Sequence, residues 1–284
     1  MKLVQRIAIG YYKTKIKTIA LVSMRKAAEK AFELFCTPYS GKPKRKVPPI
    51  FNHAEKLNFE NDGLIIRGWK WKPEHANGKK ILIVHGFDSC SYKFDKYIQP
   101  FSSLGFEVLA FDAPAHGISD GKTINALLLS KSLLTINTLY GPLYGIMAHS
   151  FGALAAALAA EKMMHLQKLV LIAPATETRT AVDNFFKFIK LGDHIKKEVE
   201  QLIESIGQQP ISYFSVKRVV KNIQIPTLWL HDEEDTICTF EDVKPAMVAP
   251  NNHVQFHVTK GLGHSKIYRD EMVSKKIINF IAGN

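Results

Sequence analysis

Short apolar runs alternate with amphipathic stretches from residue 50 to the end of the chain. Six mostly apolar runs of four or five residues lie at positions 81–84, 108–111, 145–148, 169–172, 227–230 and 254–258. Strands buried on both faces of a sheet have this pattern, because neither side faces water. Apolar residues at helical spacing occupy residues 124–139, 151–164 and 266–281. The alternation predicts an α/β fold with a mostly parallel, doubly wound sheet.

A hairpin precedes the first buried run. Residues 56–60 and 64–71 flank Asn61-Asp62-Gly63. Asp-Gly supplies the positive φ that a tight turn needs, so we expect two antiparallel strands here.

One connection is longer than a crossover requires. About 50 residues separate the run that ends near Ala173 from the run that begins after Pro226, and apolar residues recur in them at helical spacing. We predict a helical cap insert at residues 174–223, with residues 50–173 and 224–284 as the core. A small second domain without a role in binding is the alternative.

Residues 1–49 form a basic helical arm and linker. Apolar positions between Ile16 and Leu34 follow the spacing of one amphipathic helix, which ends before Pro38. Residues 40–49 are rich in Pro and Gly and predict a linker. The first 46 residues carry a net charge of +10, out of +12 for the whole chain, so the core offers no broad nucleic-acid surface. We expect the arm to pack by its apolar stripe; a weak contact of residues 1–46 with an anionic membrane is the alternative.

The composition is that of a soluble globular protein. Of 284 residues, 46% are hydrophobic and 23% charged, and no window approaches the ~18 apolar residues of a membrane span. Cys36, Cys90 and Cys238 lie far apart without the spacing of a disulfide framework or a zinc site. With no convincing signal peptide, we predict a cytoplasmic location.

A serine follows one of the buried runs directly. In Ala148-His149-Ser150-Phe151-Gly152 an apolar strand leads into Ser150 and then into a helix of small residues. A serine on a sharp strand-to-helix turn projects its hydroxyl above the sheet, and small residues two positions before and after it leave room for the turn. A helix N-cap is the alternative role for Ser150.

This segment and four further blocks resemble the α/β-hydrolase superfamily over residues 55–284. The resemblance is in particular to its small serine hydrolases: esterases, monoacylglycerol-lipase-like enzymes and the serine aminopeptidase-like branch. The blocks, in the order of that family, are His85-Gly86-Phe87, Asp112 to Ser119, His231 to Asp235, and Gly261 to Ser265. Ala148, Ala115 and Asp232 stand where the family usually has glycine.

The resemblance implies a catalytic triad of Ser150, Asp235 and His264. The backbone N–H groups of Phe87 and Phe151 would form the oxyanion hole. Glu234 is the alternative acid. The resemblance gives His116 a structural role, and His257, inside a strand run, is expected to be packed or solvated.

These residues predict a serine hydrolase that cleaves small-molecule carboxylic esters through an acyl-enzyme, without a metal or organic cofactor. A peptide, amide or C–C bond hydrolase of the same superfamily is one alternative; an aminopeptidase would need an acidic residue such as Glu177 or Asp183 to hold a free amine. A catalytically silent binding or lipid-surface protein is the other.

Overall fold

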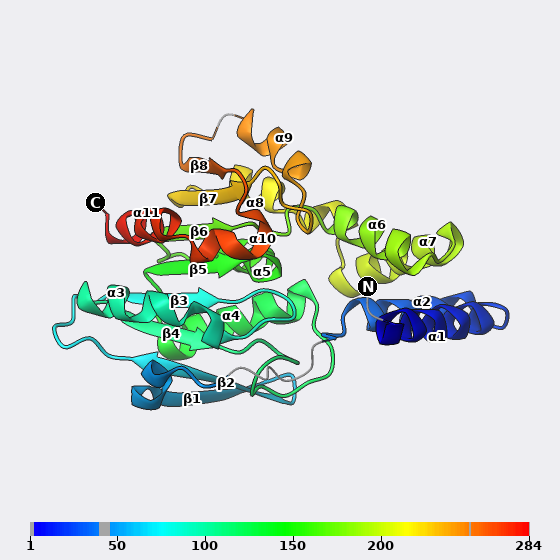
Figure 1. Cartoon of the computed structure of the whole chain (residues 1–284), viewed down its shortest axis with the longest axis horizontal. Coiled ribbons are helices and arrows are strands. Elements are labelled where there is room, and N and C mark those ends of the chain that lie inside the picture. Colours follow the sequence, from blue (N-terminus) through cyan, green and yellow to red (C-terminus); the bar gives the residue numbers. More distant parts are fainter. Residues whose placement is uncertain (1–2, 40–45, 250, 284) are drawn as a thin grey trace. The chain divides into compact units, whose positions relative to one another are not determined.

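The computed structural model describes residues 3–39, 46–249 and 251–283, which fall into two compact units. We call residues 38–176 and 215–284 the sheet unit, and residues 1–37 and 177–214 the helical unit. Figure 1 traces both along the chain. Residues 40–45 of the predicted linker lie outside the described residues.

The sheet unit is built on one eight-stranded sheet with the order β1-β2-β4-β3-β5-β6-β7-β8. Strands β1 and β2 pair antiparallel, as do β2 and β4, and all other neighbours are parallel. The predicted doubly wound fold is therefore confirmed. The strands are β1 (Glu55–Asn61), β2 (Leu64–Trp71), β3 (Lys80–Val84), β4 (Glu107–Phe111), β5 (Gly145–His149), β6 (Lys168–Ile172), β7 (Thr227–Asp232) and β8 (Val254–Thr259).

The hairpin between β1 and β2 has the predicted turn. Asp62 and Gly63 have φ angles of 51° and 73°, which match the right-handed twist of the two strands they join.

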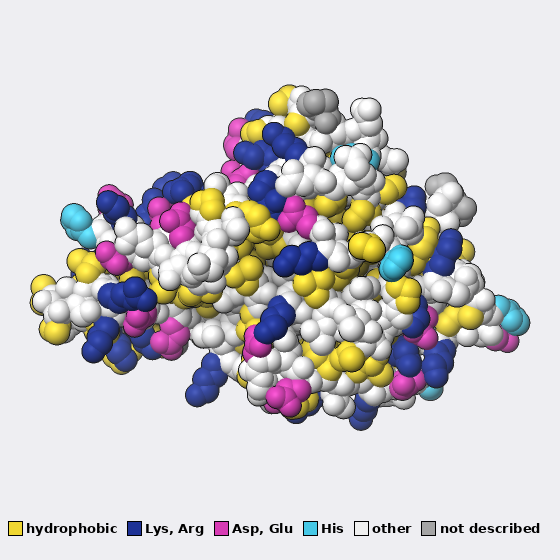
Figure 2. Space-filling view, turned by 180° about the vertical axis from the view of Figure 1, so that it is seen from behind, with side chains coloured by type: hydrophobic (Ala, Val, Ile, Leu, Met, Phe, Trp, Pro, Cys, Tyr) yellow, Lys and Arg dark blue, Asp and Glu magenta, His cyan; other side chains and the backbone are white. Residues whose placement is uncertain are grey.

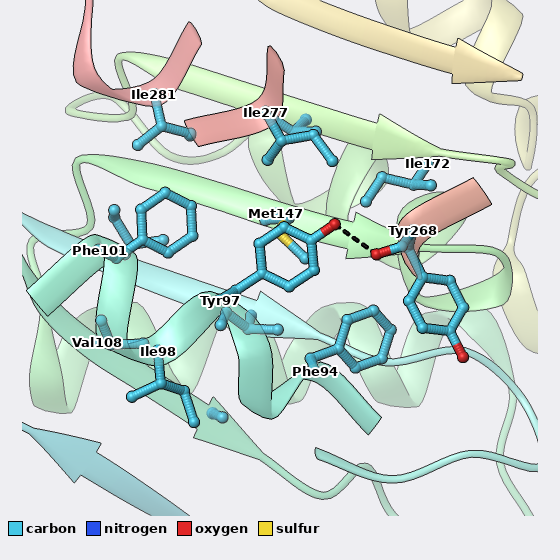
Figure 3. Packing of buried hydrophobic residues seen from close by; sticks show 14 of the residues in the cluster. Phe94, Tyr97, Ile98, Phe101, Val108, Met147, Ile172, Tyr268, Ile277 and Ile281 are labelled. Carbon is cyan, nitrogen blue, oxygen red and sulfur yellow. Dashed lines mark hydrogen bonds between the residues drawn. The ribbon is translucent and has the colours of Figure 1, made fainter. Parts of the chain in front are cut away.

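Helices pack on both faces of this sheet. On one face, Tyr97 and Phe101 lie with Ile277 and Ile281 around Met147 of β5, and the Tyr97 hydroxyl donates to the carbonyl of Tyr268 at 2.6 Å (Figure 3). Leu129 and Leu133 lie against Leu82 on the other face. The helices of the unit are η1 (Pro49–His53), η2 (Ser91–Tyr97), α3 (Ile98–Ser103), α4 (Ala126–Tyr140), α5 (Phe151–Ala160), α8 (Val216–Asn222), η4 (Phe240–Asp242), α9 (Lys244–Met247), α10 (Gly263–Lys266), η5 (Ile267–Arg269) and α11 (Glu271–Ala282).

The sequence range given to the cap insert, 174–223, includes α8, which packs in the sheet unit. Val216, Val219 and Val220 of α8 are buried, and Arg218 makes a bidentate ion pair with Glu161 at the end of α5, at 2.7 and 2.6 Å.

The helical unit contains α1 (Leu3–Ala20), α2 (Met24–Phe35), α6 (Thr178–Ile189), α7 (Asp193–Gly207) and η3 (Ile211–Tyr213). The prediction of one continuous arm helix is wrong, because Ser23 caps a new helix: its Oγ accepts from the Lys26 N–H at 3.3 Å. The apolar stripe of α2, which includes Ala27 and Leu34, is buried, and α2 packs against α7 of the insert. The arm and most of the insert thus share one core.

No helix within the described ranges is both long enough and apolar enough to cross a membrane.

Candidate active site

Ser150 lies on the sharp turn between β5 and α5. Its φ of 57° and ψ of −125° are strained for a residue with a side chain, and its N–H donates to the Ile172 carbonyl at 2.9 Å. A Cβ at Gly152 would lie 2.2 Å from the carbonyl oxygen of His85, so only glycine fits there. Ser150 makes no side-chain capping bond to α5. The geometry is that of a nucleophile turn rather than of a helix cap.

The structure brings Ser150, His264 and Asp235 together from three separate segments: the turn before α5, the short helix α10 and the loop after β7. His264 Nε2 lies 2.9 Å from Ser150 Oγ, and His264 Nδ1 lies 2.7 Å from Asp235 Oδ2. Because an ionised carboxylate only accepts, Nδ1 carries the proton of the neutral imidazole and Nε2 presents its lone pair to the serine. This is the arrangement in which a histidine can take a proton from a hydroxyl.

Asp235 is held as an acceptor from several directions. Its Oδ1 accepts from the N–H groups of Ile237 and Cys238 at 2.8 and 2.9 Å. Burial by itself raises the pKa of this carboxyl, but the bonds from His264 and from the two backbone N–H groups outweigh it and leave the pKa below its ordinary value. Asp235 therefore stays ionised beside His264. The alternative acid, Glu234, has an exposed side chain.

Asp232 links the loop that carries Asp235 to the segment that leads into α10 and His264. It is fully buried, and its Oδ1 accepts from the Glu234 N–H at 3.0 Å. Its Oδ2 accepts from Thr259 Oγ1 at 2.7 Å and from the Leu262 N–H at 3.0 Å. Sequence comparison marked Asp232 only as a departure from glycine. The structure gives it a bracing function that no local pattern could reveal.

His149 touches the loop of His264 from below. Its Nε2 donates to the His264 carbonyl at 3.0 Å, and the two rings lie 4.8 Å apart. Phe94 and Tyr268 of the core hold the ring of His149 on its other sides, with centroids 6.1 and 4.8 Å away; both are labelled in Figure 3. Sequence analysis gave His149 no function beyond its place before the serine.

The two expected oxyanion donors lie close together, Phe87 in the loop after β3 and Phe151 at the start of α5. The rings of Phe87 and Phe151 contact each other with centroids 5.8 Å apart. Phe151 opens α5, and the first N–H groups of a helix have no partner within it. A Cβ at Gly86 would lie 2.9 Å from Ser150 Cβ, so this glycine lets the loop approach the serine.

Two buried histidines secure the loop that carries Phe87. His85 Nε2 accepts from the Ala113 N–H at 2.9 Å, and His116 Nε2 accepts from the Asp88 N–H at 3.1 Å. Burial lowers the pKa of both imidazoles to about 4, which keeps them neutral and able to accept. Both ring nitrogens of His116 are thus engaged with the backbone, Nε2 with Asp88 and Nδ1 with Pro114.

A thiol borders the serine. Cys238 Sγ lies 4.0 Å from Ser150 Oγ, and the Cys238 carbonyl accepts from His231 Nε2 at 2.7 Å. Burial raises the pKa of this thiol, so it stays protonated. The sequence gave no sign of this neighbour, since Cys238 is distant from Ser150 in the chain.

The other residues considered in the sequence analysis, His257 and Asp183, make no hydrogen bond or ion pair with the three residues of the expected triad in the part of the chain that the structure describes. His257 is a half-buried residue of β8 that lines an open groove with Lys276. Asp183, considered for binding an amine, forms an ion pair with Lys196 inside the helical unit. Among the residues placed by the structure, no three His, Cys, Asp or Glu side chains are grouped in a way that could hold a metal ion.

A mostly parallel sheet with Ser150 after β5, Asp235 after β7 and His264 after β8 is the α/β-hydrolase fold, and this chain has that fold. The family model described as serine aminopeptidase S33 matches residues 75–207, which include Phe87 and Ser150.

Curated relatives match parts of the chain. A serine hydrolase-like protein of Dictyostelium discoideum is 21% identical over 189 residues, or 64% of this chain and 51% of that protein. The uncharacterized protein YqkD of Bacillus subtilis is 35% identical over 118 residues, or 38% of each chain. The chain thus aligns with about half or less of the length of these relatives.

A solved structure extends the likeness over most of the chain. The esterase Pf2001 from Pyrococcus furiosus superposes with a TM-score of 0.64 over 86% of this chain and 95% of that one, at 20% identity. At this level of identity the likeness establishes the fold, and the reaction has to be argued from the site.

Proposed function

We propose that this protein is a serine hydrolase that cleaves carboxylic esters through an acyl-enzyme intermediate. The observation that carries the proposal is the pair of hydrogen bonds that join Ser150 to His264, at 2.9 Å, and His264 to Asp235, at 2.7 Å. A serine hydroxyl is a weak nucleophile at neutral pH, and a histidine so oriented supplies the base that it needs.

The reaction follows from the positions of these groups. Ser150 Oγ attacks the ester carbonyl carbon while its proton passes to His264 Nε2. The negative charge that develops on the carbonyl oxygen is stabilised by the N–H groups of Phe87 and Phe151. His264 then donates the proton to the departing alcohol, and the acyl group stays on Ser150.

Water completes the cycle by the same route. It gives a proton to His264 as its oxygen attacks the acyl carbon, and the proton returns to Ser150 Oγ when the acid leaves. Asp235, which is kept ionised by its hydrogen bonds, stabilises the imidazolium in both halves and fixes the tautomer of His264.

The alternatives are a hydrolase of peptides or of C–C bonds and a catalytically silent protein. The structural likeness to the Pyrococcus furiosus esterase favours esters, whereas the matching family model carries the description of an aminopeptidase. The ion pair of Asp183 with Lys196 disfavours Asp183 as the group that holds a free amine. Ser150, His264 and Asp235 come from distant segments and lie within hydrogen-bond distance of one another, which disfavours a catalytically silent protein.

Hydrolysis of p-nitrophenyl esters with acyl chains of two to twelve carbons, run beside aminoacyl-naphthylamides, tests the proposal. We expect ester hydrolysis that is absent from the variant Ser150→Ala, and little or no release of naphthylamine. Faster turnover of the naphthylamides would assign the protein to the peptidases, and no turnover of any ester or amide would favour a silent protein.

A further inference from the structure

The turn between α1 and α2 exposes two aliphatic side chains. Leu21 is 88% exposed and Val22 is 90% exposed, and Met24, at the start of α2, is 37% exposed. We call residues 21–24 the hairpin tip. Leu21 and Val22 contribute almost nothing to the core of the helical unit, so folding does not account for their apolar character.

The tip is distinct from the apolar stripe of α2. That stripe, with Ala27, Ala31 and Leu34, is buried and packs towards α7, so it is not available to an outside partner. Leu21 and Val22 remain exposed and available to a partner that binds this helical pair by apolar contact.

The backbone N–H groups of residues 21–23 are already paired. The N–H groups of Leu21 and Val22 donate to the carbonyls of Thr18 and Ile19 at 3.2 and 3.0 Å, and the Ser23 N–H donates to Ile19 at 2.8 Å. Unpaired peptide groups are what makes a turn costly to bring into an apolar medium. This turn can enter one without leaving those N–H groups unsatisfied.

Basic side chains surround the tip. Lys17 in the last turn of α1 and Lys26 in the first turn of α2 are exposed. The two acidic residues of these helices are engaged, Glu29 with Arg25 at 3.2 Å and Glu33 with Lys30 at 2.7 Å. Figure 2 shows hydrophobic side chains at the end of this helical pair with lysines and arginines next to them. An exposed apolar turn flanked by lysines is complementary to a bilayer with anionic headgroups.

We propose that the hairpin tip inserts Leu21 and Val22 into the interface of an anionic lipid bilayer while Lys17 and Lys26 contact the headgroup phosphates. A nucleic acid would use the lysines but offers no apolar medium for two aliphatic side chains, so the tip as a whole favours lipid.

Sedimentation with sucrose-loaded vesicles tests this inference on the full chain. We expect binding to vesicles of phosphatidylcholine and phosphatidylserine at 7:3 and much less to phosphatidylcholine alone. The double variant Leu21→Ser/Val22→Ser should bind at least about tenfold more weakly, because both side chains lose their apolar contact. Met272→Ser, which changes an 80% exposed hydrophobic residue of the sheet unit, is the matched control and should bind as the parent does.

A charge reversal that preserves the helix isolates the electrostatic part. Lys26 occupies the third position of α2 after the cap Ser23, where glutamate completes a capping box, so Lys26→Glu keeps α2 intact. We expect this variant to bind anionic vesicles less well at 0.05 M NaCl, and the difference from the parent to shrink at 0.5 M, where the Debye length is shorter.

A tryptophan reports insertion itself. In Val22→Trp the emission should shift to the blue and be quenched by brominated lipids in anionic vesicles, whereas native Trp69, Trp71 and Trp229 are at most 6% exposed. The proposal is overturned if the parent does not bind, if Leu21→Ser/Val22→Ser binds as the parent does, or if neutral vesicles bind equally well. A dimer in light scattering that the double variant abolishes would assign the tip to self-association instead, and DNA binding that is indifferent to that variant would assign the lysines to nucleic acid.

Discussion

The imidazole of His149 donates from Nε2 to the backbone carbonyl of His264, 3.0 Å away, and so joins the residue before Ser150 to the residue that faces Ser150. Burial lowers the pKa of His149 to about 3, so its ring is neutral around pH 7. The ring itself is fixed by Phe94 and Tyr268. His149 therefore positions His264 and does not itself exchange protons.

His149→Phe tests this positioning. The variant keeps a planar ring but loses the donor, so we expect kcat to fall about tenfold to a hundredfold with little change in KM, as loss of the hydrogen bond to the half-buried His264 carbonyl predicts. His149→Gln, which retains an N–H donor, should recover part of the loss. Unchanged kcat in the phenylalanine variant, with an unchanged melting temperature, would contradict the assignment.

Ser150→Ala should abolish turnover of p-nitrophenyl esters, by at least about 10³-fold, and leave the thermal transition nearly where it was. The side chain is small and makes no capping bond, so its loss removes chemistry rather than packing. A fluorophosphonate probe should label the parent at Ser150 and leave the variant unlabelled, as peptide mapping would establish. Labelling at another serine would refute the assignment of the nucleophile.

Asp235→Asn should lower kcat for esters by several orders of magnitude, because an amide cannot stabilise the imidazolium and favours the wrong tautomer of His264. Glu234→Gln is the matched control: it makes the same chemical change on an exposed neighbouring side chain and should leave kcat within about twofold. The reverse ranking would move the acid to Glu234.

Asp232→Ala should reduce both stability and activity. The change removes the buried carboxylate that accepts from donors on Thr259, Leu262 and Glu234. We therefore expect the free energy of unfolding, measured in urea, to fall by about 2–4 kcal/mol. The exposed Glu233→Gln serves as control. Stability equal to that of the parent would mean that the carboxylate does not brace these loops.

Stability should fall as the pH drops from about 6.5 towards 4. An unfolded histidine takes up a proton near pH 6.5, whereas burial holds the pKa of His85 and His116 at about 4 in the folded state. Over this window the unfolded chain binds more protons, so acid favours it. Urea unfolding at pH 7.5, 5.5 and 4.5 measures the slope. His116→Asn should flatten it, and His75→Asn, at an exposed site, should not; a slope that His116→Asn leaves intact would speak against this source.

The strands could be predicted because parallel strands buried on both faces leave short apolar runs bounded by loop residues. Strand β5 and the small residues of α5 likewise marked Ser150. The segment Ser91–Tyr97 and α3 gave no such signal, since tyrosines, lysines and Pro100 interrupt any helical period. The break before α2 depends on one capping bond from Ser23, which a continuing apolar pattern concealed.

The surroundings of the site are tertiary, and local patterns cannot contain them. The sequence showed Asp232 only as a substitution at a position where glycine is usual. Its hydrogen-bond partners Thr259 and Leu262 lie on the next strand and the loop after it, so no local pattern connects them to Asp232. The contact of Cys238 with Ser150 spans 88 positions. The spacing of apolar residues in α2 could not show that they are buried against α7, because an apolar stripe on one helix can pack against any apolar face.

The helical unit draws its two parts from opposite sides of about 140 residues of sheet-forming chain. During synthesis α2 therefore emerges well before α7, and at about 5–20 residues per second it waits roughly 7–30 s for its partner. In that interval its alanine and leucine stripe lacks the surface of α7 against which it packs in the folded protein. Phe214, the last residue of the helical unit, is translated before β7 begins. The nascent chain can thus complete the helical unit while the sheet still lacks two strands and both the acid and the base of the proposed triad.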